Sequence, residues 1–285
     1  MTVWEAIVEP LRYPFMVRAL LAAVLVGGLS AVVGSFVVLR SMTFLGDALS
    51  HAVLPGIAAG YVVAGRADRR SLFWWALATA IAVALGIDRV SRHGKVREDA
   101  AIGIIFTGAF ALGVALISTI RGFAVDLVHV LFGNVLGVSN GDLILMGVFG
   151  LAVLLVVVLF YKELVLVSFD ATLATTLRMP TSAYRIILLV LVAVTVVVSL
   201  QTVGLGLMLA MLVTPASTAY LVTRRLPRMM LVGALLGVFA GIAGLYLSFY
   251  IGVSSGAAVV LVAISLFLLV LVGHPKTGLV ARALR

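Results

Sequence analysis

The chain of 285 residues is 64% hydrophobic and only 11% charged, whereas a soluble domain is roughly half apolar and about a quarter charged. Apolar runs of about 18 residues or more recur along it, each long enough to span a bilayer as a helix, so the composition excludes a soluble domain and indicates an integral membrane protein. The net charge of +9 comes from basic residues scattered among short loops. Orientation in the membrane and contact with anionic lipids explain this charge better than nucleic-acid binding does.

Hydropathy predicts an all-α, polytopic membrane protein with about nine transmembrane helices, within a range of roughly eight to ten. The predicted spans, in chain order, are Phe15–Leu39, Asp47–Ala64, Leu72–Val90, Ala100–Thr119, Gly141–Tyr161, Tyr184–Leu200, Val203–Val222, Met229–Ile251 and Gly256–Gly273.

Two shorter segments separate some of these spans. Ala124–Val138 is apolar but short, which favours a partial or re-entrant helix on the outer side. Ser168–Met179 mixes polar and apolar residues, which is more typical of a helix at the membrane surface. If Ala124–Val138 crosses the membrane instead, the topology of the first half of the chain inverts.

The basic loops indicate the orientation of the spans. Lys and Arg concentrate in Arg89–Arg97, in Arg224–Arg228 and in the tail after Gly273. Because cytoplasmic loops carry an excess of basic residues, nine spans with an outside N-terminus place all three segments in the cytoplasm. Three arginines between residues 66 and 70 fall on the opposite side in this topology.

Asp47 and His51 lie four residues apart in the second predicted span. On a helix this spacing places a carboxylate and an imidazole on the same face, about 5–6 Å apart at Cβ. Ionisable groups at membrane depth normally face a protein interior or a water-filled path, and this pair of ligands suits Mn²⁺, Fe²⁺ or Zn²⁺. The spacing alone supports a functional pair that handles a metal ion or protons about as well as it supports a buried hydrogen-bonded pair that only fixes helix packing.

The residues after this pair favour a functional site. Pro55-Gly56 should kink or end the helix, and a non-helical backbone at membrane depth is tolerated only where it is buried or lines a cavity. Ser50 lies next to His51 and could line the same path. Asp126 and His129 could form a second acid–imidazole pair at the entrance, although surface hydration explains them better.

Other conspicuous residues have structural interpretations. Glu98 and Asp99 precede a predicted span and are expected to cap it, and Asp170 is expected to cap the surface segment. Gly233, Gly237 and Gly241 form two overlapping G-x-x-x-G steps, which favour close packing within the chain over a dimer contact.

The motifs that are absent from this sequence limit its chemistry. It contains no G-x-x-x-x-G-K-[ST], so it cannot bind ATP through a P-loop of its own. It also contains no H-E-x-x-H and no G-x-S-x-G, and Ser50 and His51, as neighbours on a helix, point about 100° apart. We therefore expect a transport protein rather than an enzyme.

The run from Arg40 to Gly56, with its core G-D-x-x-S-H-x-x-x-P-G, resembles the permease subunits of ABC importers for manganese, zinc or iron, the ABC-3 family. Four further stretches agree with that family in order, and the resemblance covers nearly the whole chain. They are Glu98–Gly103, Leu131–Asn134, Glu163–Asp170 and Val203–Ala216.

The resemblance implies a type II importer permease in the bacterial plasma membrane, with residues 1–285 forming one transmembrane domain. Asp47 and His51 fall on the metal-coordinating positions of the family. The segment 168–179 matches its coupling helix, with Phe169, Asp170 and Met179 meeting the ATPase. The implied partners are a second copy of the chain, a cytoplasmic ATPase subunit, an extracytoplasmic metal-binding protein and membrane lipids. The family has no permanently bound cofactor, and manganese is slightly favoured as the transported ion over zinc or iron.

Two departures from the family pattern concern the ends of the pathway. The coupling segment ends in Leu177-Arg178-Met179-Pro180, where the family often has glycine. Before Ser255-Gly256-Ala257 the chain lacks the acidic residue and proline that are common in the family. The alternative function is an ATP-independent secondary transporter in which Asp47 and His51 relay protons; such carriers usually contain internal repeats, and no convincing repeat is present.

Overall fold

The computed structural model describes residues 5, 8–64, 69–93, 96–120 and 135–273, and its regular elements are helices. Nine helices in this part of the chain are long and apolar enough to cross a membrane, which confirms the predicted all-α, polytopic class. The ends of the predicted spans differ from those of the helices by three residues or fewer. The long elements are α2 (Pro14–Leu39), α3 (Phe44–Ala52) followed by α4 (Leu54–Ala64), α5 (Arg69–His93), α6 (Glu98–Ser118), α8 (Asn140–Leu159), α11 (Thr181–Val203), α12 (Leu205–Val222), α13 (Leu226–Ile251) and α14 (Ser255–Gly273).

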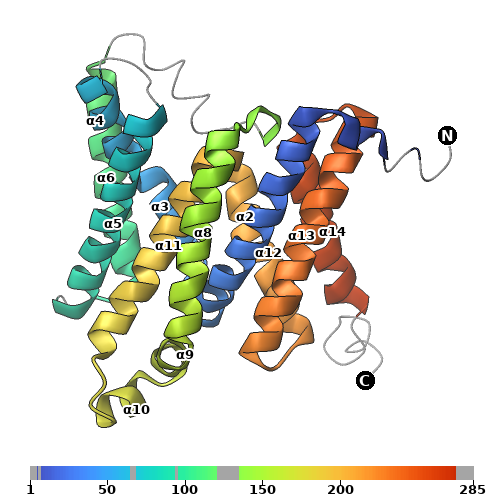
Figure 1. The fold of residues 1–285 in the computed structure, drawn as a ribbon. Coiled ribbons are helices and arrows are strands. Elements are labelled where there is room, and N and C mark those ends of the chain that lie inside the picture. The colour runs from blue at the N-terminus through green and yellow to red at the C-terminus, as the bar shows by residue number, and fades with distance from the viewer. Residues whose placement is uncertain (1–4, 6–7, 65–68, 94–95, 121–134, 274–285) are drawn as a thin grey trace. The chain divides into compact units, whose positions relative to one another are not determined.

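The chain divides into two compact units, of which unit 1 comprises residues 1–38, 132–148 and 202–285. In this unit α12, α13 and α14 pack against one another, and the short helix η2 (Val135–Gly137) contacts α14. A second short helix, η1 (Pro10–Arg12), precedes α2. Figure 1 shows that α2 begins at the end of this unit where α14 also begins, and that α14 finishes at the other end. The first and last spans therefore run in the same direction, as an odd number of spans requires.

The glycine steps of α13 explain how closely α2 approaches it. A Cβ atom built on Gly237 would lie 2.6 Å from the carbonyl oxygen of Gly27, and one on Gly27 would lie 2.7 Å from the carbonyl carbon of Gly237. Gly233 and Gly241 also face α2. These contacts confirm packing within the chain as the role of the G-x-x-x-G steps.

Unit 2 comprises residues 39–131 and 149–201, and it carries both segments for which a function was predicted. Here α4 packs against α5 and α6, α3 contacts the same two helices, and α5 contacts α6. The second part of α8 leads into two short helices, α9 (Tyr161–Phe169) and α10 (Ala171–Thr176), which contact each other before α11 begins.

The turn after α10 keeps its conformation although the coupling segment lacks the glycine that the family often has there. The backbone N–H of Arg178 donates to Thr175 at 2.9 Å and that of Met179 donates to Ala174 at 3.1 Å, which is the hydrogen-bond pattern of a Schellman motif. The residue at the turn of this motif is usually glycine because it takes a left-handed conformation. Arg178 occupies that position with φ of 56°, so the chain keeps the turn without the glycine.

Replacing Arg178 with glycine should stabilise the protein by about 1 kcal/mol, because a side chain with a Cβ atom is strained in the left-handed region. Arg178→Ala keeps the Cβ atom and should leave the stability close to that of the wild type. The midpoint of thermal unfolding, measured on the detergent-purified protein, checks both expectations. Equal midpoints for the glycine and alanine variants would contradict the assignment of strain to this residue.

Candidate metal site

The predicted metal pair lies on α3, directly before a break in the second span. α3 ends at Ala52, and α4 begins at Leu54 after a single intervening residue, Val53. Pro55 lies in the first turn of α4, where its missing N–H leaves no helical hydrogen bond unmade. The break predicted from Pro55-Gly56 is thus confirmed, at Val53, two residues beyond His51.

The side chains of Asp47 and His51 point towards each other on one face of α3. Asp47 Oδ1 and His51 Nε2 lie 3.6 Å apart, and the two side chains are 36% and 31% exposed. Two ligands of a tetrahedral ion, each about 2.1 Å from it, are separated by roughly 3.4 Å. The observed spacing therefore fits two ligands of one divalent ion with only a small adjustment.

Aromatic rings of α6 cover one side of the imidazole. The ring centroids of Phe106 and Phe110 lie 6.3 Å and 6.0 Å from that of His51, and Phe110 is edge-on to it. Phe44, at the start of α3, also packs edge-on against Phe106 at 5.9 Å. The rings restrict the orientation of the imidazole and keep water from that side of the pair.

Glycines bring the helices around the break into close contact. A Cβ atom on Gly113 of α6 would lie 2.5 Å from Leu54 Cβ and 2.9 Å from the nitrogen of Pro55. On the other side, a Cβ atom on Gly56 would collide with the backbone of Trp75 in α5. The break behind the metal pair is therefore held between α5 and α6.

The described residues of one chain supply only part of a metal shell. Among the residues described by the structure, no group of three or more His, Asp or Glu side chains could hold a metal ion. Ser50 is fully buried, and its hydroxyl donates to the carbonyl oxygen of Asp47 at 2.7 Å. Asp126 and His129, the predicted second pair, lie outside the described residues. The roles of all these residues stay predictions.

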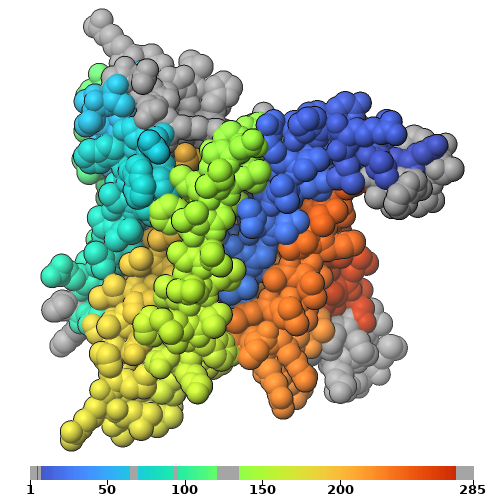
Figure 2. Space-filling view, viewed as in Figure 1, coloured from blue at the N-terminus to red at the C-terminus, as the bar shows by residue number. Residues whose placement is uncertain are grey.

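The predicted coupling segment presents an apolar surface. Phe169, Leu173 and Leu177 recur every four residues and are 62%, 45% and 58% exposed, and Figure 2 shows this part of the chain, in yellow, at the surface. The hydroxyls of Thr175 and Thr176 donate to carbonyl oxygens one turn back in α10, so they offer no free donor to a partner.

Two of the predicted coupling residues have defined structural positions. Asp170 caps α10, because its carboxylate accepts a hydrogen bond from the N–H of Leu173 at 2.8 Å, as predicted. Met179 is half-buried in the turn that follows α10.

A network of charged side chains in unit 2 was not predicted. Glu98 was expected to cap α6, and it lies in the first turn of that helix, but Arg97 is the N-cap residue and its side chain makes no capping hydrogen bond. The carboxylate of Glu98 instead accepts a hydrogen bond from Arg185 Nη2 of α11 at 3.0 Å. The signal that could have indicated such a network is Asp88, an acidic residue inside a predicted span with Arg92 one turn later.

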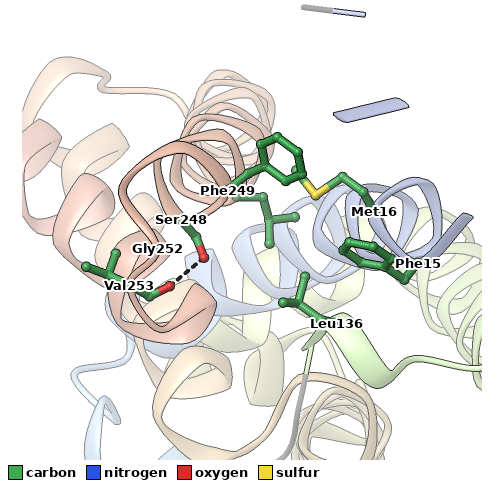
Figure 3. Close-up of a pocket in the computed structure, with 8 residues that line it drawn as sticks. Phe15, Met16, Leu136, Ser248, Phe249, Gly252 and Val253 are labelled. Atoms are coloured by element: carbon green, nitrogen blue, oxygen red, sulfur yellow. Dashed lines mark hydrogen bonds between the residues drawn. The ribbon is translucent and has the colours of Figure 1, made fainter. Parts of the chain in front are cut away.

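A separate cavity of about 290 Å³ lies in unit 1, between the start of α2, η2 and the end of α13. Figure 3 shows its lining, in which Ser248 Oγ donates to the carbonyl oxygen of Val253 at 2.7 Å. None of the described residues that line it has an ionisable side chain. Gly252, which ends α13 with φ of 75°, shapes the turn where the acidic residue of the family pattern is missing.

The nine candidate spans in the described part of the chain define a multi-pass membrane protein. The model of the ABC 3 transport family matches residues 12–274. The manganese transport system membrane protein MntC of Halalkalibacterium halodurans is 47% identical over 95% of this chain and 91% of its own length. The chelated iron transport system membrane protein YfeC of Yersinia pestis is 33% identical over 99% of this chain and 94% of its own length.

Among solved structures, a chain of PsaBC from Streptococcus pneumoniae, determined in complex with a Fab, is 35% identical to this chain. It superposes with a TM-score of 0.81 and the match covers 99% of both chains. This chain belongs to the ABC 3 transport family. It is a membrane permease subunit, the component of such a transporter that has no ATPase domain.

Proposed function

We propose that this chain is the membrane-spanning subunit of an ATP-driven importer of Mn²⁺, with Fe²⁺ as the second candidate ion. The observation that carries the proposal is the pair Asp47 and His51, whose 3.6 Å spacing suits one divalent ion. The relatives named for manganese and for iron transport are 47% and 33% identical to the chain, which favours Mn²⁺. Residues 1–285 act together as one permease domain in this proposal.

A second copy of the chain completes the site. Each chain contributes one carboxylate and one imidazole, so a symmetric dimer brings four ligands to one ion, enough for a tetrahedral shell or for an octahedral shell completed by water. Both side chains are about one-third exposed, which leaves them accessible to ligands from a second copy. Because the ion has to leave again, two ligands per chain are better suited to transport than a closed cage would be.

A cytoplasmic ATPase subunit docks on α10. The support for this is the exposed apolar row of Phe169 at the end of α9, Leu173 in α10 and Leu177 just after α10. The absence of a P-loop from this sequence supports it as well. Amphipathic helices commonly insert such a row into a groove of the partner. An extracytoplasmic metal-binding protein delivers the ion on the other side of the membrane.

The proposed function is tested by metal uptake into proteoliposomes that contain the permease, its ATPase and its binding protein. We expect Mn²⁺ uptake to require ATP on the ATPase side and to persist when an uncoupler removes the proton gradient. Uptake of Fe²⁺ and Zn²⁺, supplied at the same concentration, is compared with that of Mn²⁺ to rank the ions. Uptake that continues without ATP and stops with the uncoupler would establish the secondary transporter instead.

A further inference from the structure

Arg185 of α11 connects carboxylates on two other helices of unit 2. Its Nη2 atom lies 3.0 Å from Glu98 Oε1 at the start of α6, and its Nε atom lies 3.3 Å from Asp88 Oδ1 near the end of α5. It also bonds the hydroxyl of Ser91 on α5. A planar guanidinium can serve two carboxylates in this way, which the single ammonium of lysine cannot reproduce.

The same network reaches the segment that leads into the metal site. Arg40 Nη2 lies 3.5 Å from both carboxylate oxygens of Glu98, and Arg40 immediately follows α2. The side chains of Asp88 and Arg40 are only 6% and 12% exposed. Burial lowers the pKa of Arg40, while the neighbouring Glu98 carboxylate raises it. With little water to screen them, these ion pairs hold their helices more firmly than surface pairs do.

On one side, Arg185 is joined to the coupling segment by a short hydrogen-bonded connection. The Schellman turn after α10 is followed by Pro180, whose carbonyl accepts the N–H groups of Ala183 and Tyr184 at the start of α11. Arg185 is the next residue. Because this connection is short and hydrogen-bonded, a displacement of α10 is expected to displace Arg185 as well.

On the other side, Glu98 and Arg40 each lie on a segment of the chain that leads to the metal pair. Phe106 and Phe110, which cover the imidazole of His51, lie on the same helix as Glu98, about 12–18 Å along its axis. Arg40 precedes α3 by a turn in which Ser41 takes a left-handed conformation, with φ of 54°. Asp47 follows within the first turn of α3.

We propose that Arg185 is a positioning residue that transmits movement of α10 to the metal pair, through Glu98 to α6 and through Glu98 and Arg40 to α3. The proposal rests on the function proposed above. ATP binding by the partner displaces α10, Arg185 carries Glu98 with it, and the aromatic cover of His51 and the start of α3 follow. The ion is thereby released or admitted in step with ATP hydrolysis.

A purely structural role for Arg185 makes a different prediction. If the network only holds the helices together, loss of Arg185 lowers the amount of folded complex, and uptake and ATP hydrolysis decline in proportion. If Arg185 transmits movement, the complex still hydrolyses ATP but moves less metal for each ATP. The ratio of metal transported to ATP hydrolysed separates the two roles.

Arg92 provides a matched control. Its Nε atom lies 3.0 Å from Asp88 Oδ2, so it also forms an ion pair with Asp88, but both residues lie on α5 and the pair joins no second helix. Arg185→Gln and Arg92→Gln therefore remove the same kind of interaction from the same carboxylate. Only the first of them breaks the link between helices.

The experiment measures Mn²⁺ uptake and ATP hydrolysis in proteoliposomes of the full importer. We expect Arg185→Gln to lower the ratio of Mn²⁺ to ATP by about tenfold, within the range of roughly 5–150-fold that is typical of coupling between sites. Arg92→Gln should keep the wild-type ratio. Arg185→Lys, which keeps the charge but cannot hold both carboxylates, should also lower the ratio, and it decides the question if Arg185→Gln does not assemble.

A wild-type ratio in the Arg185→Lys complex, or an equal loss in the Arg92→Gln complex, would overturn the role of Arg185 and leave the proposed function standing. If the wild-type complex shows no ATP-driven uptake, the proposed function itself is contradicted, and so is the role of Arg185 that rests on it.

Discussion

Replacing Asp47 with asparagine should lower Mn²⁺ uptake by at least about 100-fold, because loss of a partner that only orients a ligand already costs roughly 10–100-fold in metal affinity. Asparagine keeps the shape of the side chain but not its negative charge, so a symmetric dimer would lose both of its anionic ligands. His51→Gln should have an effect of the same size. The measurement is ATP-dependent uptake by the reconstituted importer.

Asp142 offers the matched control for this substitution. It is also a carboxylate near the start of a span, but it is buried and, as the third residue of α8, accepts hydrogen bonds from the backbone N–H and the hydroxyl of Ser139 in a capping box. The amide oxygen of asparagine can accept the same two hydrogen bonds, so Asp142→Asn should leave uptake close to the wild-type level. Normal uptake by both Asp47→Asn and His51→Gln, with intact assembly, would show that the pair only fixes helix packing.

Placing a charge on α10 should prevent assembly with the ATPase. Leu173 lies in the middle of the exposed apolar row, between Phe169 and Leu177. If that row is buried in a groove of the ATPase, Leu173→Asp leaves an unpaired carboxylate there and should weaken the complex by at least about 100-fold, as for a central interface residue. Co-purification of the permease with its ATPase measures the effect.

Leu11 allows the same substitution to be made elsewhere. Its side chain on η1 is 44% exposed, almost the same as the 45% of Leu173, but it lies far from α10 in the sequence. Leu11→Asp should leave the complex with the ATPase intact. A stable complex with Leu173→Asp would mean that the ATPase does not dock on the apolar row of α10.

Much of the fold was predictable because it depends on local sequence. Span lengths follow from the apolar runs, and the break between α3 and α4 follows from Pro55-Gly56. The shared face of Asp47 and His51 follows from their four-residue spacing on a helix. The capping role of Asp170 likewise needs only its neighbours in sequence.

The contacts between distant residues could not be predicted in the same way. Glu98 and Arg185 are 87 residues apart, so their ion pair depends on which helices become neighbours rather than on spacing. A carboxylate in the first turn of a helix is also consistent with capping, which is why the role predicted for Glu98 was wrong. Similarly, the partners of the α13 glycines depend on how α2 packs against α13, which the G-x-x-x-G pattern alone does not specify.

The central claim is that His51 and Asp47 bind the transported ion, and pulsed electron paramagnetic resonance of bound Mn²⁺ tests it most directly. The spectrum would be recorded on the complex of permease and ATPase, without the binding protein, for the wild type and for His51→Gln. We expect coupling of the Mn²⁺ electron spin to an imidazole nitrogen in the wild type and its loss in the variant. The same nitrogen coupling in both samples would contradict the assignment of His51 as a metal ligand.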